Sequence, residues 1–173
     1  MEKLKADEDS RAFLDTTFLL PFFQLDIAVE AFTLGKFKDF LEGLSEVHVS
    51  ELSVFEAKAK IFRLSRKDSA YADALKNFGK NLALLREDEK FFFHPYMEVD
   101  DAQFNLISSI NQNLDSFDII ILAQASNIGL LITEDKEILD LREREKFKKD
   151  PFLRKLLIRR WKEIIARDRF EVA

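Results

Sequence analysis

Four acidic residues stand at positions where their side chains could act together. Asp15 and Asp135 each follow a short apolar run, Asp118 opens a longer apolar run, and Glu56 falls within a helical pattern. Carboxylates that are gathered in one place repel each other unless a cation neutralises them. Hard oxygen ligands without Cys or His select Mg²⁺ or Mn²⁺ over zinc, and such ions commonly bind substrate phosphates as well. The predicted chemistry is therefore metal-dependent and acts on a phosphate.

The segments that must position these acids alternate between short apolar runs and amphipathic stretches. Continuous apolar character predicts strands at residues 12–14, 47–49, 91–93 and 130–132. Helical spacing predicts helices at 25–33, 36–44, 51–64, 68–86, 100–113, 118–128, 136–142 and from Pro151 onwards, with Asp100 or Asp101 as the cap of the fifth. Strands that alternate with helices favour an α/β fold with a parallel sheet covered on both faces. Such a sheet binds ligands at the carboxyl ends of its strands, where all four acids can meet.

Length and composition limit the class of protein. A chain of 173 residues fits one domain, and 47% hydrophobic with 34% charged residues is ordinary for a globular protein. The absence of cysteine excludes a disulfide framework, a thiol nucleophile and a Cys-ligated zinc site. No apolar run approaches the roughly 18 residues of a membrane span, and the charged first ten residues do not form a signal peptide. We therefore predict a cytoplasmic protein that does not enter a membrane.

The charge is distributed unevenly along the chain. Residues 142–169 contain 12 Lys or Arg and 5 Asp or Glu, whereas the rest of the chain has 15 basic and 27 acidic residues. The net charge of −5 thus combines an acidic body with a basic C-terminal segment. This pattern suits a polyanion that is guided towards a metal centre. A solvated helix face followed by a loop would explain it equally well.

Each of the four acids lies in a short motif. Asp15 ends the run Phe-Leu-Asp within Phe-Leu-Asp-Thr-Thr, and Glu56 ends Val-His-Val-Ser-Glu-Leu-Ser-Val-Phe-Glu. Asp118 opens Asp-Ile-Ile-Ile-Leu-Ala-Gln-Ala, and Asp135 closes Gly-Leu-Leu-Ile-Thr-Glu-Asp. In this order and at this spacing, over about residues 11 to 140, the four motifs resemble those of the PIN-domain nucleases.

The resemblance implies a fold and an activity. The fold is a three-layer α/β/α sandwich around a parallel sheet of about five strands, although the sequence shows no clear fifth strand. The activity is metal-dependent endoribonuclease cleavage with Mg²⁺ or Mn²⁺ that leaves a 5′-phosphate, commonly by a VapC-like toxin that is paired with an antitoxin. The expected regions are a frayed, charged leader (1–10), a PIN-like nuclease domain (11–142) and a basic helical extension packed on the same domain (143–173).

The resemblance also implies roles for individual residues. The core metal-binding and catalytic acids would be Asp15, Glu56 and Asp118, and Asp135 would complete the site or hold a second ion. Either Thr16 or Thr133 would place a hydroxyl near the metal. A homodimer is expected, with its contact through the C-terminal helix or the helix at 68–86.

Other interpretations of the same residues stay open. Asp15 and Asp135 could each serve only as a helix cap, and Asp118 could be a charge favoured by a helix N-terminus, with Asp115 as a rival for that place. Glu56 could be an ordinary solvated residue. The chain could then be a catalytically silent PIN-like module that binds RNA or a protein. A DNA structure-specific nuclease is a third hypothesis, but the additional acids and helical arch of that class have no counterpart here.

Three aromatic residues have structural roles in this interpretation. His48 lies in a predicted buried strand and His94 before a turn, and neither has a second histidine at ligand spacing. We expect both to be structural. Trp161, in the apolar stripe of the last predicted helix, is expected to anchor packing rather than to stack on a base.

Overall fold

The computed structural model describes residues 10–167, which form a five-stranded sheet. The strands are β1 (Arg11–Leu14), β2 (Glu46–Ser50), β3 (Phe91–His94), β4 (Leu130–Ile132) and β5 (Leu157–Arg159). Their order across the sheet is β3-β2-β1-β4-β5, and every neighbouring pair is parallel. The four strands predicted from apolar runs are confirmed. Apart from Ser10, the predicted leader lies outside the described residues.

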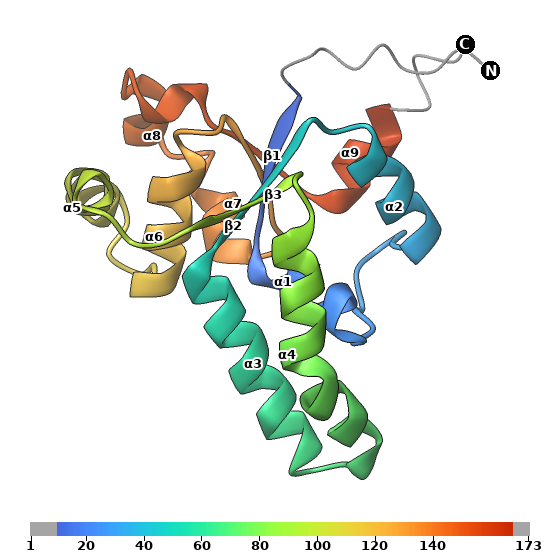
Figure 1. The fold of residues 1–173 in the computed structure, drawn as a ribbon. Coiled ribbons are helices and arrows are strands. Elements are labelled where there is room, and N and C mark those ends of the chain that lie inside the picture. Colours follow the sequence, from blue (N-terminus) through green and yellow to red (C-terminus); the bar gives the residue numbers. More distant parts are fainter. Residues whose placement is uncertain (1–9, 168–173) are drawn as a thin grey trace.

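Helices cover both faces of the sheet, as Figure 1 shows. One group comprises α1 (Thr16–Leu19), the 3₁₀ turn η1 (Leu20–Phe23), α2 (Leu34–Glu42), α3 (Glu51–Ser65), the 3₁₀ turn η2 (Ser69–Tyr71), α4 (Ala72–Glu87) and α9 (Trp161–Arg167). The other comprises α5 (Glu98–Ile110), α6 (Ser116–Ala125), α7 (Lys136–Leu141), α8 (Glu145–Lys149) and the 3₁₀ turn η3 (Leu153–Lys155). The predicted three-layer α/β/α sandwich with a parallel sheet is confirmed.

Alternation along the strands divides the core into two layers. Leu14, Val47 and Ile132 pack with the group of helices that includes α3 and α4. Phe13 and Leu131, one position away, pack instead with α5 to α8. Because successive side chains of a strand point to opposite faces, a sheet that is covered on both faces needs apolar residues at both sets of positions.

Trp161 is the centre of one of these layers. Its side chain has 0% exposure and contacts a group of aromatic rings, those of Phe18, Phe32, Phe37 and Phe40. Its indole Nε1 donates a hydrogen bond of 3.3 Å to the Ala31 carbonyl. The predicted role as a packing anchor is confirmed.

The continuous helix predicted from Pro151 onwards was wrong. The segment instead forms η3, then β5, and only then the short helix α9. Leu153, Leu157, Trp161 and Ile164 have the spacing of a helical stripe. The sheet, however, has an open edge at β4, and pairing with it satisfies the backbone groups of residues 157–159. The fifth strand, which the resemblance implied, is therefore supplied by the basic C-terminal segment.

Two further predictions need correction. Residues 25–33 are not helical, because their apolar side chains pack as an irregular segment that includes Ala31 at a φ of 61°. Helix α5 begins at Glu98, so Asp100 is not its N-cap residue but lies in its first turn. The Asp100 carboxylate accepts a hydrogen bond of 2.8 Å from the Met97 backbone N–H, which closes the helix start.

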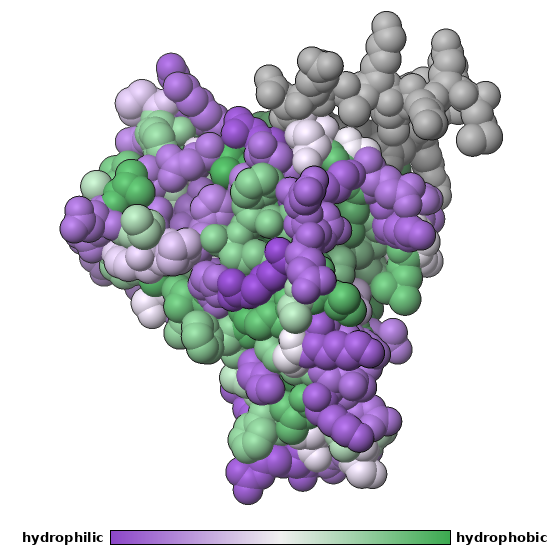
Figure 2. Space-filling model, viewed as in Figure 1, coloured by the Kyte–Doolittle hydropathy of each residue, from purple (hydrophilic) through white to green (hydrophobic). Residues whose placement is uncertain are grey.

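The surface mixes hydrophilic and hydrophobic areas on the face shown in Figure 2. Exposed large hydrophobic side chains occur on the α3–α4 hairpin, at Phe55, Phe62 and Leu84, and on β3, at Phe92. Within residues 10–167, no helix is both long enough and apolar enough to cross a membrane.

Candidate active site

Asp15 lies at the carboxyl end of β1 and is almost entirely buried. It is the N-cap residue of α1, and its Oδ1 accepts a hydrogen bond of 2.6 Å from the Thr16 backbone N–H. Its other oxygen, Oδ2, accepts a hydrogen bond of 2.7 Å from the Thr133 hydroxyl. Capping therefore uses one carboxylate oxygen only, so the cap and a role in the site are compatible.

Glu56 reaches the same place from α3. Ser50 ends β2 and caps this helix, since its Oγ accepts a hydrogen bond of 3.2 Å from the Leu52 backbone N–H. Residue 56 is then nearly two turns into the helix, on the side that faces α1. Its carboxylate accepts a short hydrogen bond from the Thr16 hydroxyl. Glu56 is thus not the freely solvated residue of the alternative interpretation.

Asp115 and Asp118 have different roles at the start of α6. Asp115 is the N-cap residue, and its Oδ1 accepts hydrogen bonds of 2.8 Å from Phe117 N–H and 2.9 Å from Asp118 N–H. Asp118 lies one turn further on and makes no capping bond. The two residues were rivals in the sequence, but the structure directs both carboxylates to one pocket.

The segment directly after β4 brings three more residues to the carboxyl edge of the sheet, Thr133, Glu134 and Asp135. Asp135 caps α7, with hydrogen bonds to Oδ1 of 2.8 Å from Glu137 N–H and 3.0 Å from Ile138 N–H. Glu134 lines the same pocket, and its Oε1 accepts a hydrogen bond of 2.9 Å from the Trp161 backbone N–H.

The four predicted acids therefore meet in one pocket of about 370 Å³ at the carboxyl edge of the sheet. Thr16 lines the pocket with them, whereas Thr133 lies just beneath, fully buried. Three lining residues were not among the predicted site residues, namely Thr17, Asp115 and Glu134. Thr17 could have been found as the neighbour of Asp15–Thr16. Nothing in the sequence connects Glu134 with Trp161, 27 residues away, since the strand between them was not recognised.

Burial and the closeness of these acids to one another shift the pKa values of two of them. Burial raises the pKa of Asp15 to about 6, while the hydrogen bonds from Thr133 and Thr16 lower it and the nearby charges of Glu56 and Asp135 raise it. The pKa of Asp118 is raised to about 7, chiefly by burial and also by the charges of four neighbouring carboxylates, Asp115, Asp135, Asp15 and Glu56. Both shifts disfavour the charged state, and a bound cation would relieve them.

The donor set fits a hard divalent cation. The pocket offers carboxylate and hydroxyl oxygens and no His, which matches the ligands that Mg²⁺ and Mn²⁺ prefer. In the part of the chain that the structure describes, no three His, Asp or Glu side chains form a ready ligand shell. The acids instead hold their hydrogen bonds to Thr16, Thr133 and the start of α7.

His48 and His94, which lie apart in the sequence, meet on the opposite face of the sheet from α3. His48 Nδ1 lies 2.8 Å from His94 Nε2, and His48 Nε2 lies 2.9 Å from a carboxylate oxygen of Glu46. Burial lowers the pKa of both histidines. Sequence spacing gave neither histidine a partner, but adjacent strands β2 and β3 bring the two rings together.

Fold and site together define a class of protein, parallel α/β/α sandwiches with an acidic pocket at the carboxyl edge of the sheet. Residues 12–144 match the family model of the PIN domain. The chain belongs to the PIN-domain family, whose members are in general nucleases that use divalent metal ions.

A solved structure shares the fold over nearly its entire length. The crystal structure of PAE2754 from Pyrobaculum aerophilum matches with a TM-score of 0.58 and 13% sequence identity, covering 94% of this chain and 96% of that chain. At this identity the likeness concerns the fold alone. No match was found among curated proteins.

Proposed function

We propose that this protein is an endoribonuclease that depends on Mg²⁺ or Mn²⁺ and hydrolyses RNA phosphodiesters. The observation that carries the proposal is the convergence of Asp15, Glu56, Asp118 and Asp135, from four separate segments, on one pocket. Membership of the PIN-domain family supports nuclease chemistry for these acids. Capping explains the positions of Asp15 and Asp135, but Glu56 lies inside α3 and Asp118 makes no capping bond, so capping does not account for their place in the same pocket.

In this proposal Asp15, Glu56, Asp118 and Asp135 hold the metal. A bound Mg²⁺ or Mn²⁺ would lower the pKa of a water and offset the negative charge of the phosphodiester. The threonines keep the acids in place. Thr16 donates its hydroxyl to Glu56 and Thr133 donates its hydroxyl to Asp15, so neither carboxylate can turn away without the loss of a hydrogen bond.

Cleavage of single-stranded RNA, with and without EDTA, tests the proposal. We expect activity with Mn²⁺ or Mg²⁺, none with EDTA, and a decrease of about 100-fold or more in Asp118→Asn. Asp140→Asn is the matched control, because Asp140 is an exposed acid on α7 outside the pocket. A wild-type protein that is inactive with both metals, or an Asp118→Asn variant as active as the wild type, would contradict the assignment.

We extend the proposal to a VapC-like toxin that is held inactive by an antitoxin and acts as a homodimer in the cytoplasm. Its support is the resemblance of the four motifs, in order and spacing, to those of such toxins. Expression of this chain alone should arrest growth, and co-expression with a short neighbouring reading frame should restore it. Light scattering measures the mass of the protein in solution, and the mass of a monomer would contradict the proposed homodimer.

A further inference from the structure

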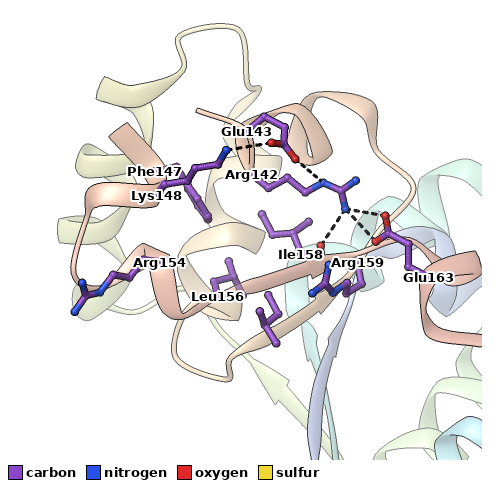
Figure 3. A pocket seen from close by; sticks show the side chains of 10 residues that line it. Arg142, Glu143, Phe147, Lys148, Arg154, Leu156, Ile158, Arg159 and Glu163 are labelled. Carbon is purple, nitrogen blue, oxygen red and sulfur yellow. Dashed lines mark hydrogen bonds and ion pairs between the residues drawn. The ribbon is translucent and has the colours of Figure 1, made fainter. Parts of the chain in front are cut away.

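A second pocket, of about 420 Å³, lies along β5 and the segment before it. Figure 3 shows its lining. The charged lining residues are four cations, Arg142, Lys148, Arg154 and Arg159, and two acids, Glu143 and Glu163. The pocket is therefore cationic on a protein whose net charge is −5. Apolar side chains such as Phe147 and Ile158 form the rest of its wall.

Both acids of this pocket are already engaged. Glu163 accepts hydrogen bonds of 3.0 Å from Arg142 Nη1 on both oxygens, and Oε2 also accepts one of 3.1 Å from Arg160 N–H. Glu143 pairs with Lys148 at 3.1 Å and with Arg142 at 3.6 Å. Arg142 also donates a hydrogen bond of 3.3 Å to the Ile158 carbonyl, so its guanidinium is held in place on β5 (Figure 3).

Arg159 and the exposed Arg154 are the two cations of this pocket that form no ion pair with its acids within residues 10–167, and Arg159 is the one on β5. Its Nε is buried and has no hydrogen-bond partner among residues 10–167. It takes part in none of the ion pairs found there. Arginine stays charged in proteins, so Arg159 brings a positive charge to this pocket without an ion-pair partner. An anion is the ligand that pairs best with a guanidinium, since planar paired donors match the oxygens of a phosphate or carboxylate.

Hydrogen bonds connect the segments that line this pocket with those that line the acidic pocket. The Arg159 carbonyl accepts a hydrogen bond of 3.0 Å from Thr133 N–H, and the Thr133 hydroxyl donates to Asp15. Glu134 of the acidic pocket accepts a hydrogen bond from the backbone N–H of Trp161, which lies two residues after Arg159. Arg159 of the cationic pocket and Glu134 of the acidic pocket therefore lie on adjoining segments of the chain.

We propose that Arg159, together with Arg142, binds a phosphate of the RNA strand at a position away from the cleaved bond. This inference rests on the proposed ribonuclease function. The acidic pocket repels a polyanion, and a neighbouring cationic pocket with an unpaired guanidinium donor offsets that repulsion. A phosphodiester fits better here than an acidic peptide, because the site adjoins the segments of the acidic pocket, which we propose cleaves RNA.

Binding of a labelled single-stranded RNA in EDTA tests the proposal without cleavage. An RNA of roughly 12 nucleotides lies within the usual site sizes of single-strand binders. We expect Arg159→Gln to raise the Kd by about tenfold and to reduce the slope of log K against log salt by about 0.7, the loss of one phosphate contact. Arg159→Lys, which keeps the charge but not the paired donors, should fall in between.

The control variant is Lys80→Gln. Lys80 is an exposed cation on α4, which packs against β3 at the opposite edge of the sheet from β5. Its RNA affinity should equal that of the wild type, and circular dichroism should show the same fold for all variants. The comparison thereby separates the loss of a particular cation from the loss of any positive charge.

Three outcomes would overturn the inference. The first is an unchanged Kd in Arg159→Gln, and the second is a wild-type protein that does not bind RNA in EDTA. The third is displacement of the RNA by a polyglutamate peptide at equal charge concentration, which would assign the pocket to an acidic protein. Binding that depends on Arg159 but is not followed by cleavage when metal is added would leave this inference intact and refute the ribonuclease proposal instead.

Discussion

The hydroxyl of Thr133 donates a hydrogen bond of 2.7 Å to Asp15 Oδ2, across 118 residues of sequence. Both residues come directly after neighbouring strands, β1 and β4, and both are buried. The contact fixes the orientation of the carboxylate that lies deepest in the acidic pocket. It also lowers the pKa of Asp15, against the larger effect of burial.

Replacement of Thr133 by valine removes this hydrogen bond at almost constant volume, together with the bond of 3.0 Å that the Thr133 hydroxyl accepts from the Asp135 backbone N–H. We expect the pKa of Asp15 to rise further, because the hydrogen bond that favours its charged form is lost. Mn²⁺ should then bind half-maximally at a higher pH, and the free energy of unfolding should decrease by about 1 to 2 kcal/mol. Calorimetric titration of Mn²⁺ between pH 5 and about 8 and urea unfolding measure the two effects.

Thr17→Val serves as the control for that experiment. The Thr17 side chain lines the same pocket but takes part in no hydrogen bond found within the described residues. Its pH dependence of Mn²⁺ binding should match that of the wild type. Equal shifts in both variants would show that a general change in pocket polarity, and not the bond to Asp15, is responsible.

Asp118→Asn should stabilise the metal-free protein at neutral and higher pH. The pKa of Asp118 is about 7 in the folded protein, against an ordinary value of 3.8 for an aspartate in the unfolded chain. The stability that its protonated form contributes is fully present below pH 3.8 and is lost as the pH rises through about 7. The amide stays neutral, so the variant avoids this loss of about 1 to 2 kcal/mol, after allowance for solvent around the half-buried carboxylate.

Urea unfolding in EDTA at pH 5 and about 8 measures the difference in the free energy of unfolding between Asp118→Asn and the wild type. This difference should be larger at the higher pH. Asp140→Asn, the exposed acid on α7, should give a much smaller difference at both values. A variant that is less stable than the wild type at the higher pH would show that the Asp118 carboxylate makes a favourable contact in the folded state.

Divalent metal should stabilise the wild-type protein, and more so as the pH rises. A ligand that binds only the folded state raises its stability by mass action. Because Asp15 and Asp118 have pKa values of about 6 and 7, protons compete with the metal below these values. The melting temperature should rise with Mn²⁺ at pH 8, rise less at pH 5, and return to its starting value with EDTA. If Mn²⁺ raised the melting temperature of Asp118→Asn by the same amount, the ion would bind elsewhere.

His48→Gln should flatten the pH dependence of stability in the mildly acidic range. The folded-state pKa of His48 is lowered, chiefly by burial, so the fold favours the neutral ring. The unfolded chain then binds more protons, and stability is lost as the pH falls through 6.5 towards the folded pKa. The variant lacks this loss, although at pH 8 it should be less stable by about 1 to 2 kcal/mol because the hydrogen bonds to Glu46 and His94 are weakened.

Comparison of wild type and His48→Gln at each pH isolates this contribution, since the acidic pocket is common to both. Urea unfolding between pH 5 and about 8 is the measurement. Two stability curves that run parallel over this range would show that His48 takes up no proton when the chain unfolds.

The acidic pocket shows which parts of a site were predictable. Asp15 and Asp135 follow apolar strands directly, and parallel strands end at a common edge, so local patterns were enough to bring the two together. Glu56 and Asp118 lie on helices, where only the motif register, and not the local pattern, indicated a site. Glu134 was missed, because its partner Trp161 lies beyond a strand that was not recognised.

The sequence by itself determined the fold class, four of the five strands and the acids that meet at one edge. Each of these depends on local apolar periodicity, capping residues or motif spacing, which a chain displays before it folds. Only the tertiary structure decided that 157–159 is a strand, that His48 meets His94, and that Arg159 lies unpaired beside the acidic edge. Those features depend on which backbone and side-chain groups are left without partners when distant segments pack, and no local pattern records that.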